Sequence, residues 1–326
     1  MNEATREGTP RVEWGLVIHG GVGVLPREDL TPELEAAYLE ALQASLRSGF
    51  ESMQAGGGAV AGVVEAIKVM EDSPLFNAGR GSNFTADGVV SMDASIMVGD
   101  TLEAGAVAGV KDVRYPIRLA QHVMEECPHV MLAGEGAEAF ARSVGMASET
   151  PEFFFTQRRW DDLQAAKARE EKGEGRPNTV DVGDSVPSRD RSGTVGAVAL
   201  DQTGKLVAGT STGGSANKKW GRIGDSPVIA AGTYAGSHCG VSCTGWGEYF
   251  IRYAVAHDIQ ARMAYKGLSL RDATAEVVKG ELERLRRGLG GVVAMDRKGY
   301  VEMCFSTQGM YRGWVDQEGE IRAAIF

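Results

Sequence analysis

A glycine–threonine pair opens an apolar strand pattern in the second half of this chain. The run Thr194-Val-Gly-Ala-Val-Ala-Leu-Asp201 follows Gly193, and a second run ends at Thr210-Ser-Thr212-Gly-Gly. Together the two runs predict a buried hairpin with threonines at one end. If the chain cuts itself before Thr194, that residue supplies both a nucleophilic hydroxyl and a base, because a free α-amine has a pKa of about 7.7–8.0.

The glycine before the threonine suits the cutting step. Gly193 lacks a Cβ and can adopt strained backbone conformations, so the Thr194 oxygen can reach the Gly193 carbonyl for an N-to-O acyl shift. The β-branch of threonine also restricts the orientation of its hydroxyl. The alternative is a Gly-Thr pair that simply begins a strand.

An arginine and an aspartate lie three residues apart in Gly221-Arg-Ile-Gly-Asp225. A substrate with a free α-carboxylate and a free α-ammonium needs a planar cation for the first group and a carboxylate for the second. Arg222 and Asp225 meet that requirement within one turn. The alternative interpretation of such a pair is a surface salt bridge.

Several ordered motifs resemble the plant-type asparaginase and isoaspartyl aminopeptidase family of N-terminal-nucleophile hydrolases, over nearly the whole chain. Besides the two segments above, the motifs that carry the resemblance are Ile18-His-Gly-Gly21, Leu75-Phe-Asn-Ala-Gly79, Gly232-Thr-Tyr-Ala235, Ser242-Cys-Thr-Gly-Trp-Gly-Glu248 and Ser306-Thr-Gln-Gly309.

The resemblance implies a role for each site residue. Thr194 is expected to be the nucleophile, released by self-cleavage after Gly193. The family's second threonine corresponds to Thr212, whose hydroxyl would bond the nucleophile. Expected donors to the developing oxyanion and the substrate are Thr244, Gly245 and Asn77. Arg222 and Asp225 would hold the aspartyl end of the substrate.

The resemblance also implies a structural sodium ion and self-association. The segment from Met70 to Arg80 resembles the family's sodium loop, in which main-chain carbonyls surround Na⁺. The carbonyls expected to do so here belong to Met70, Glu71, Ser73, Phe76, Ala78 and Arg80. No cofactor is expected for the chemistry. A dimer of αβ units, (αβ)2, is the implied assembly.

The implied activity is hydrolysis of L-asparagine or of β-aspartyl dipeptides through a covalent β-aspartyl ester on Thr194. Two alternatives remain. Glycosylasparaginase acts on sugar-linked asparagine, usually after secretion; Thr212-Gly-Gly and the lack of a signal-peptide pattern argue against it. A non-catalytic binding homologue is the other, and the intact threonines argue against that.

The elements that must position these residues follow from local patterns. Thr31 and Pro32 begin a helix that repeats apolar residues at Leu34, Tyr38, Leu42 and Leu46, and further helices are expected over 59–71, 116–126, 134–144, 248–265 and 270–287. Ser269 is the expected N-cap of the last helix. Three Asp-x-x-Gly turns, 201–204, 296–299 and 316–319, join strands. Strands at both ends with helices between predict an α/β fold, a four-layer αββα sandwich.

The domain organisation follows from the expected cut. Residues 1–193 form an α subunit ending in a flexible linker of about residues 170–193, and residues 194–326 form a β subunit. The two parts should make one structural domain.

Composition excludes several function classes. The net charge is −10 and no basic patch mixes with aromatics, so nucleic acid is not expected as a partner. The four cysteines and five histidines lack metal-site spacing, and no apolar stretch reaches about eighteen residues. A cytoplasmic protein acting on small molecules, without a membrane partner, is expected.

Overall fold

The computed structural model describes residues 11–172, 193–285 and 289–326. Most of the predicted linker of about residues 170–193 lies outside the described residues, as does the end of the predicted helix 270–287. None of the helices in the described part of the chain is both long enough and apolar enough to cross a membrane.

Two β-sheets form the centre of the fold. The larger contains β1 (Gly15–Gly21), β2 (Met92–Val98), β3 (Ala104–Val110), β4 (Met131–Ala133), β5 (Val195–Leu200), β6 (Leu206–Thr212), β11 (Tyr311–Val315) and β12 (Ile321–Ala324). Its strand order is β12-β11-β1-β5-β6-β2-β3-β4. The smaller contains β7 (Thr233–Ala235), β8 (Cys239–Gly245), β9 (Gly290–Asp296) and β10 (Val301–Phe305), in the order β10-β9-β8-β7.

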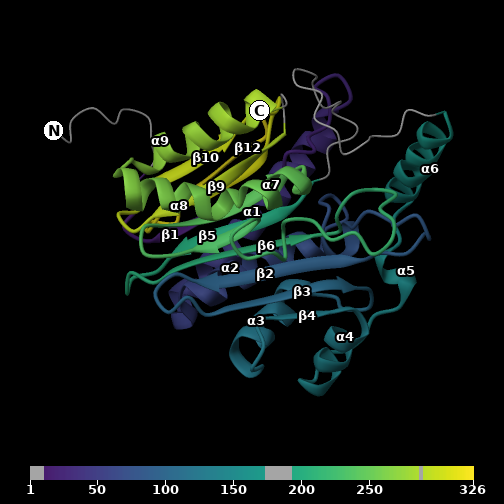
Figure 1. The fold of residues 1–326 in the computed structure, drawn as a ribbon, viewed down its shortest axis with the longest axis horizontal. Coiled ribbons are helices and arrows are strands. Elements are labelled where there is room, and N and C mark those ends of the chain that lie inside the picture. Colours follow the sequence, from purple (N-terminus) through teal and green to yellow (C-terminus); the bar gives the residue numbers. More distant parts are fainter. Residues whose placement is uncertain (1–10, 173–192, 286–288) are drawn as a thin grey trace.

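Helices cover the outer face of each sheet. Those of the first 172 residues are α1 (Pro32–Ser52), α2 (Gly58–Asp72), α3 (Pro116–Glu126), α4 (Gly134–Ser143), α5 (Pro151–Phe154) and α6 (Gln157–Glu171), with short η2 (Met53–Gly57) and η3 (Gly79–Gly81). The rest are α7 (Gly247–Tyr253), α8 (Val255–Lys266), α9 (Leu270–Ala275), η5 (Glu276–Leu282) and α10 (Glu283–Leu285). Helices α1, α2 and α3 pack on the large sheet, and α8 and α9 on the small one (Figure 1).

The layers explain why the central strands read as continuous apolar runs. Leu16 and Ile18 of β1 point into the core beneath the helices, whereas Val17 between them points into the core shared by the two sheets. Both faces of β1 are therefore buried, and alternation between apolar and polar residues disappears. The four-layer αββα prediction is confirmed.

The local signals for turns and caps are also confirmed. Each Asp-x-x-Gly turn closes with a bond from the glycine N–H to the aspartate carbonyl, at 2.9, 2.9 and 3.0 Å for the turns ending at Gly204, Gly299 and Gly319. The three glycines have φ of 82°, 79° and 83°, which glycine adopts without strain. Thr31 and Ser269 cap α1 and α9.

Two of the predicted helices are interrupted in the structure, so their prediction as continuous helices is wrong. The stretch 248–265 is two helices, broken at Ala254 in the left-handed conformation (φ 46°). Contacts with another segment accompany the break. The N–H groups of Ala256 and His257, which have no acceptor within the first turn of α8, donate to the carbonyls of Ala231 and Ala230. The stretch from 270 contains the π-helical segment η5 between α9 and α10. Helix α6, capped by Thr156, was not predicted at all.

Candidate active site

The β5–β6 hairpin brings two threonines together. Thr194 immediately precedes β5, and Val195 pairs with Ser211 near the end of β6, so Thr194 lies beside Thr212. The Thr194 Oγ1 donates to the Thr212 Oγ1 at 3.2 Å, and both residues are buried. The predicted hairpin therefore exists, and its end places two hydroxyls in contact.

The Gly193 carbonyl oxygen lies within the same cluster. It accepts hydrogen bonds from Asn77 Nδ2 at 2.6 Å and from Thr212 Oγ1 at 3.3 Å. Thr212 Oγ1 in turn accepts the Gly214 N–H at 3.0 Å. A carbonyl held by two donors is polarised toward negative charge on its oxygen, which favours attack at its carbon.

Asn77 is fixed on every side. Its Nδ2 also donates to the Gly214 carbonyl at 2.8 Å, and its Oδ1 accepts the Asn83 N–H at 2.8 Å. The Asn83 side chain donates to the same Gly214 carbonyl at 2.8 Å. Asn83 was missed by sequence reasoning, because an asparagine after a turn has no signal that separates it from an ordinary loop residue. The rigid amide is a preorganised donor.

Gly21 makes room for this arrangement at the end of β1. Its φ is 102°, and a Cβ there would lie 2.8 Å from both the Gly193 Cα and the Thr194 nitrogen. A side chain at this position would displace the bond between the two residues. The absence of a side chain on Gly21 thus lets the end of β1 approach Gly193 and Thr194.

Thr194, Thr212, Arg222, Asp225 and Gly245 line one small cavity. Its other lining residues are Gly214, Ser215, Gly224 and Ser226. The structure therefore brings the predicted nucleophile and the two predicted substrate-binding charges to a single space. That space lies at the end of the β5–β6 hairpin.

Arg222 pairs with a residue that sequence reasoning did not assign to the site. Its Nε and Nη2 bond Glu248 Oε1 and Oε2 at 2.9 and 3.0 Å, a two-point contact. Glu248 stands in the first turn of α7. The two-point contact fixes the orientation of the guanidinium, and no salt bridge between Arg222 and Asp225, the alternative considered from the sequence, is formed.

Asp225 remains available to a cation. Its Oδ2 is buried and has no hydrogen-bond partner among the described residues. Burial raises the pKa of Asp225 to about 7, and the nearby Arg222 charge opposes that rise. A buried carboxylate oxygen facing a cavity without a partner is suited to accept an ammonium group.

Thr244 and Gly245 lie at the end of β8. Gly245 lines the cavity, and a Cβ there would come within 2.4 Å of the Leu289 carbonyl oxygen. Thr244 is buried, and its Oγ1 accepts the Val22 N–H at 3.3 Å. The structure thus places Gly245 at the cavity and ties the Thr244 hydroxyl to the segment after β1.

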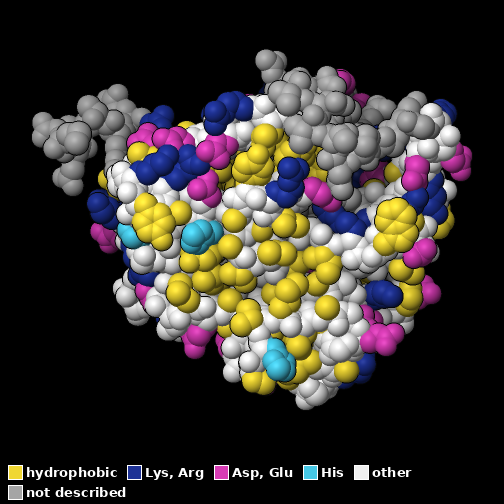
Figure 2. All heavy atoms as spheres, viewed as in Figure 1, with side chains coloured by type: hydrophobic (Ala, Val, Ile, Leu, Met, Phe, Trp, Pro, Cys, Tyr) yellow, Lys and Arg dark blue, Asp and Glu magenta, His cyan; other side chains and the backbone are white. Residues whose placement is uncertain are grey.

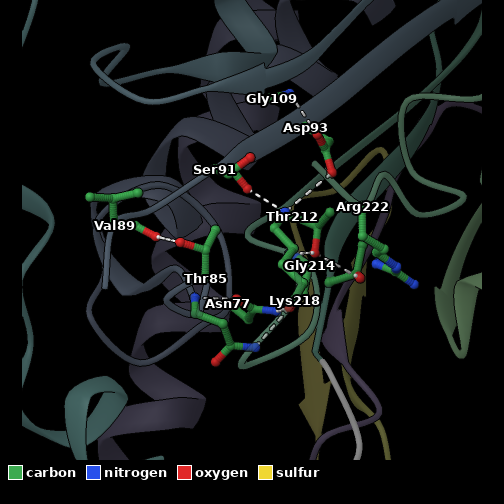
Figure 3. A network of polar contacts seen from close by, with 12 residues as sticks. Asn77, Thr85, Val89, Ser91, Asp93, Gly109, Thr212, Gly214, Lys218 and Arg222 are labelled. Carbon is green, nitrogen blue, oxygen red and sulfur yellow. Dashed lines mark hydrogen bonds and ion pairs between the residues drawn. The ribbon is translucent and has the colours of Figure 1, made fainter. Parts of the chain in front are cut away.

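A buried lysine beside the site was also missed. Lys218 Nζ donates to the Ser91 carbonyl at 2.6 Å and lies 3.8 Å from Asp93 Oδ2 (Figure 3). A Cβ on Gly214 would be 2.7 Å from the same Nζ. A positive charge therefore lies next to the loop that Asn77 contacts. A lysine in a polar loop has the sequence pattern of a solvated residue, so nothing signalled its burial.

The segment predicted to hold sodium covers the end of α2 and the residues that follow it. A Cβ on Gly81 would lie 2.0 Å from the Phe76 carbonyl oxygen and 2.9 Å from that of Ser73, and one on Gly79 would lie 2.2 Å from that of Glu71. Those three carbonyls therefore crowd around η3. The carbonyls of Met70 and Ala78 accept the N–H groups of Ser73 and Gly81, and the Arg80 guanidinium lies over the Phe153 ring.

Metal-binding and thiol chemistry each require a particular arrangement of side chains. Among the described residues, no group of three or more His, Cys, Asp or Glu side chains is placed to hold a metal ion. The Cys243 thiol, next to Thr244, is buried in the core beneath α8, and burial raises its pKa well above the ordinary value. That thiol is therefore not a prepared nucleophile.

The chain is similar to known proteins over almost its whole length. The family model described as asparaginase matches residues 12–325. The isoaspartyl peptidase of Salmonella typhimurium is 47% identical over 300 residues, covering 92% of this chain and 94% of the relative. A probable isoaspartyl peptidase/L-asparaginase 2 of Arabidopsis thaliana is 40% identical, covering 96% and 99%. The plant-type L-asparaginase of Pyrococcus abyssi is 41% identical, covering 90% and 94%.

Proposed function

This chain belongs to the asparaginase family, and we propose that it hydrolyses the side-chain amide of L-asparagine and the β-peptide bond of β-aspartyl dipeptides. The observation that carries the proposal is the cavity lined by Thr194, Arg222 and Asp225. Both substrates end in the same L-aspartyl group. Its α-carboxylate would bind the Arg222 guanidinium, and its α-ammonium would bind the buried Asp225 carboxylate. That group would present its side-chain carbonyl to the Thr194 oxygen.

The proposed reaction has two halves. The Thr194 hydroxyl attacks the side-chain carbonyl while the freed α-amine of the same residue takes the hydroxyl proton. The proton passes to the leaving nitrogen, and ammonia or an amino acid departs from a β-aspartyl ester. Water, deprotonated by the same amine, then hydrolyses the ester and releases aspartate. Asn77 and Gly245 would stabilise the oxyanion in both halves, each such donor contributing about 3 kcal/mol.

Self-cleavage between Gly193 and Thr194 is proposed to prepare this nucleophile. In the intact chain the Thr194 hydroxyl points at Thr212 Oγ1, and the Thr212 hydroxyl points at the Gly193 carbonyl. The contacts are those that an attack by Thr194 on Gly193 requires: an acceptor for the proton and donors for the oxyanion. The cut then leaves Asn77 and Thr212 with donors free for the substrate, and gives an α chain of 1–193 and a β chain of 194–326.

A structural Na⁺ is proposed at the segment 70–80. The carbonyls near Gly79 and Gly81 fit a hard cation that prefers oxygen ligands, since those of Ser73 and Phe76 both lie within 3 Å of the position that a Cβ on Gly81 would take. The ion would hold the loop that carries Asn77 and takes no part in the bond-making steps. A higher melting temperature in sodium chloride than in choline chloride would support it, and equal values would contradict it.

Self-association into (αβ)2 is proposed as well. Hydrophobic side chains gather across the middle of the face seen in Figure 2, with charged groups around its rim. Apolar areas of that kind on a protein surface favour contact with another protein. The number of αβ units is measured by sedimentation velocity. A cytoplasmic location stays a prediction, tested by cell fractionation.

The activity is tested with a panel of four substrates. L-Asparagine, a β-aspartyl dipeptide, the α-aspartyl dipeptide of the same two residues and N-glycosyl-asparagine are supplied to the purified protein. We expect aspartate to form from the first two and no cleavage of the α-linked control, because its scissile carbonyl is not on the side chain. Activity confined to N-glycosyl-asparagine would contradict the proposal.

A further inference from the structure

His19 lies against the nucleophile from the inside of the molecule. It is fully buried in β1, and its Nδ1 is 3.0 Å from the Thr194 carbonyl oxygen. The pairing of β1 with β5 ends at His19 and Gly196, so this carbonyl lies beyond the last paired residues. A carbonyl only accepts hydrogen bonds, so Nδ1 carries the proton and donates it.

The other ring nitrogen begins a chain of buried hydroxyls. Burial lowers the pKa of His19 to about 3, so the ring is neutral and its Nε2 is an acceptor. Ser242 Oγ, 2.9 Å away on β8, therefore donates to it. Ser242 Oγ lies 2.7 Å from Thr210 Oγ1 on β6, and the Ser242 proton is already used, so the Thr210 hydroxyl is the donor in this contact. The Gly232 carbonyl, 3.1 Å from Thr210 Oγ1, is a second acceptor for the same proton.

The chain continues across both sheets to the substrate-binding loop. Thr233 Oγ1 on β7 donates to Thr210 Oγ1 at 2.6 Å. Ser95 Oγ on β2 lies 2.8 Å from Thr233 Oγ1 and donates to the Ser226 carbonyl at 2.6 Å. Ser226 follows Asp225 directly. One end of the hydroxyl chain thus holds the Thr194 carbonyl, and the other end holds the residue beside Asp225.

Gly196 of β5 packs closely against the start of this chain. A Cβ on Gly196 would lie 1.9 Å from Ser242 Oγ and 2.5 Å from His19 Nε2. Gly196 stands two residues after Thr194, so the strand that carries the nucleophile passes directly beside the His19–Ser242 bond. Such a contact requires glycine at that point, which explains one of the small residues of β5.

We propose that His19 is a positioning residue for catalysis: its imidazole fixes the Thr194 carbonyl, and the chain Ser242–Thr210–Thr233–Ser95 fixes the imidazole and joins the nucleophile to the Asp225 loop. The inference rests on the proposed role of Thr194. His19 touches neither the cavity nor the Thr194 oxygen that attacks. It acts through the backbone of Thr194, which after the cut is a chain end that only its C-terminal side holds in place.

Two substitutions of His19 separate its two bonds. His19→Asn keeps an amide donor near the position of Nδ1, facing Thr194, and loses the contact with Ser242. His19→Gln puts its amide near the position of Nε2, facing Ser242, and loses the contact with Thr194. Each removes one buried hydrogen bond, so both should lower the melting temperature to a similar extent.

The expected result is a difference in turnover and not in stability. Rates are divided by the amount of cleaved β chain, measured by mass spectrometry. His19→Gln should lower kcat by about tenfold or more with KM near the wild-type value, because a misplaced nucleophile costs rate. His19→Asn should stay within about threefold of wild type. If only the His19→Gln variant fails to cut itself while both variants have the same melting temperature, the result supports the same role. Self-cleavage and substrate hydrolysis both use the Thr194 hydroxyl oxygen.

A second pair of variants tests the middle of the hydroxyl chain. Thr210→Val removes its hydroxyl, and Thr210→Ser keeps it. Thr274→Val is the matched control, because Thr274 is equally buried on α9 and does not contact the chain. We expect Thr210→Val to lose activity and Thr210→Ser to recover it, with Thr274→Val active.

Defined outcomes would overturn the inference. It fails if the Asn and Gln variants of His19 have equal kcat, or if Thr210→Val and Thr274→Val lose activity equally and in proportion to their melting temperatures. An inactive wild-type protein would instead refute the proposed function, so the two failures are distinguishable.

Discussion

Single charged and hydroxyl groups at the candidate site are held in fixed positions by their neighbours. Asp225 has a buried oxygen without a hydrogen-bond partner, and Arg222 is held in a two-point contact by Glu248. A solvated pair would be screened and mobile, whereas these groups are desolvated and held in place, as binding of the proposed zwitterionic end group would require. The sequence motif predicted Arg222 and Asp225 as a pair of charges that bind the substrate, and both line the cavity with Thr194. It did not reveal Glu248, because the partner lies 26 residues away.

Arg222→Ala should damage substrate use far more than folding. Losing one member of a partly buried charge pair that also binds substrate is expected to lower kcat/KM by about 30- to 1000-fold, equivalent to about 2–4 kcal/mol. Arg252→Ala on the same α7 helix as Glu248 is the control, because Arg252 lies over the Tyr249 ring and does not line the cavity with Thr194. If Arg222→Ala has normal kinetics on L-aspartyl substrates, Arg222 does not bind the substrate carboxylate.

Asp225 should impose its own pH dependence. Its pKa is raised to about 7 by burial, so its charge is lost as the pH falls through that value. Free enzyme then loses the partner for the substrate ammonium, so kcat/KM should decrease more steeply below about pH 7, in addition to the decrease in both constants that protonation of the Thr194 α-amine causes. In the enzyme–substrate complex, the substrate ammonium stabilises the charged form of Asp225 and lowers its pKa. Because kcat reports this complex, kcat should decrease at a lower pH than kcat/KM does. Steady-state profiles of both constants check this, and coincident profiles would contradict it.

At the scale of elements, the hairpins and caps were accessible to sequence reasoning because their signals are local. An aspartate side chain and a glycine with positive φ define each Asp-x-x-Gly turn within four residues. The break at Ala254 was not accessible, because its cause is a contact with Ala230 and Ala231 on another segment. Helix α6 was hidden by a charged composition that resembles a linker.

Two of these turns offer a matched comparison. Gly204 and Gly299 have nearly equal φ of 82° and 79°. Alanine at Gly204 would have no neighbour within 4 Å, whereas alanine at Gly299 would place its Cβ 1.6 Å from the Val12 carbonyl oxygen. Gly204→Ala should cost about 1 kcal/mol of unfolding free energy, from backbone strain alone. Gly299→Ala should cost about 1–3 kcal/mol more, from overpacking. Urea unfolding measures both, and equal losses would show that the contact relaxes freely.

At the scale of the whole molecule, the proposed α and β chains alternate within one sheet. Strands β5 and β6 of the β chain lie between β1 and β2 of the α chain, and β11 and β12 continue the sheet beyond β1. Separating the chains would break three antiparallel pairings, β11 with β1, β1 with β5 and β6 with β2. The order of strands could not be read from the sequence, because it depends on pairings between segments more than 100 residues apart, such as Asp93 with Thr212.

The cleaved protein should therefore behave as one unit. Gel filtration in native buffer should elute both fragments in one peak, and only denaturant should separate them. Thermal unfolding should show a single transition for the pair. A fragment that elutes alone in native buffer would contradict the interleaved arrangement.

Covalent catalysis by Thr194 can be observed by mass spectrometry of the enzyme during turnover with L-asparagine, after quenching in acid. We expect a chain that begins at Thr194, and a second form of it that is heavier by one aspartyl group esterified to that residue. Thr194→Ala should give one uncut, unmodified chain. An active protein of 326 intact residues, or an aspartyl group on any other residue, would refute the assignment of Thr194 as the nucleophile.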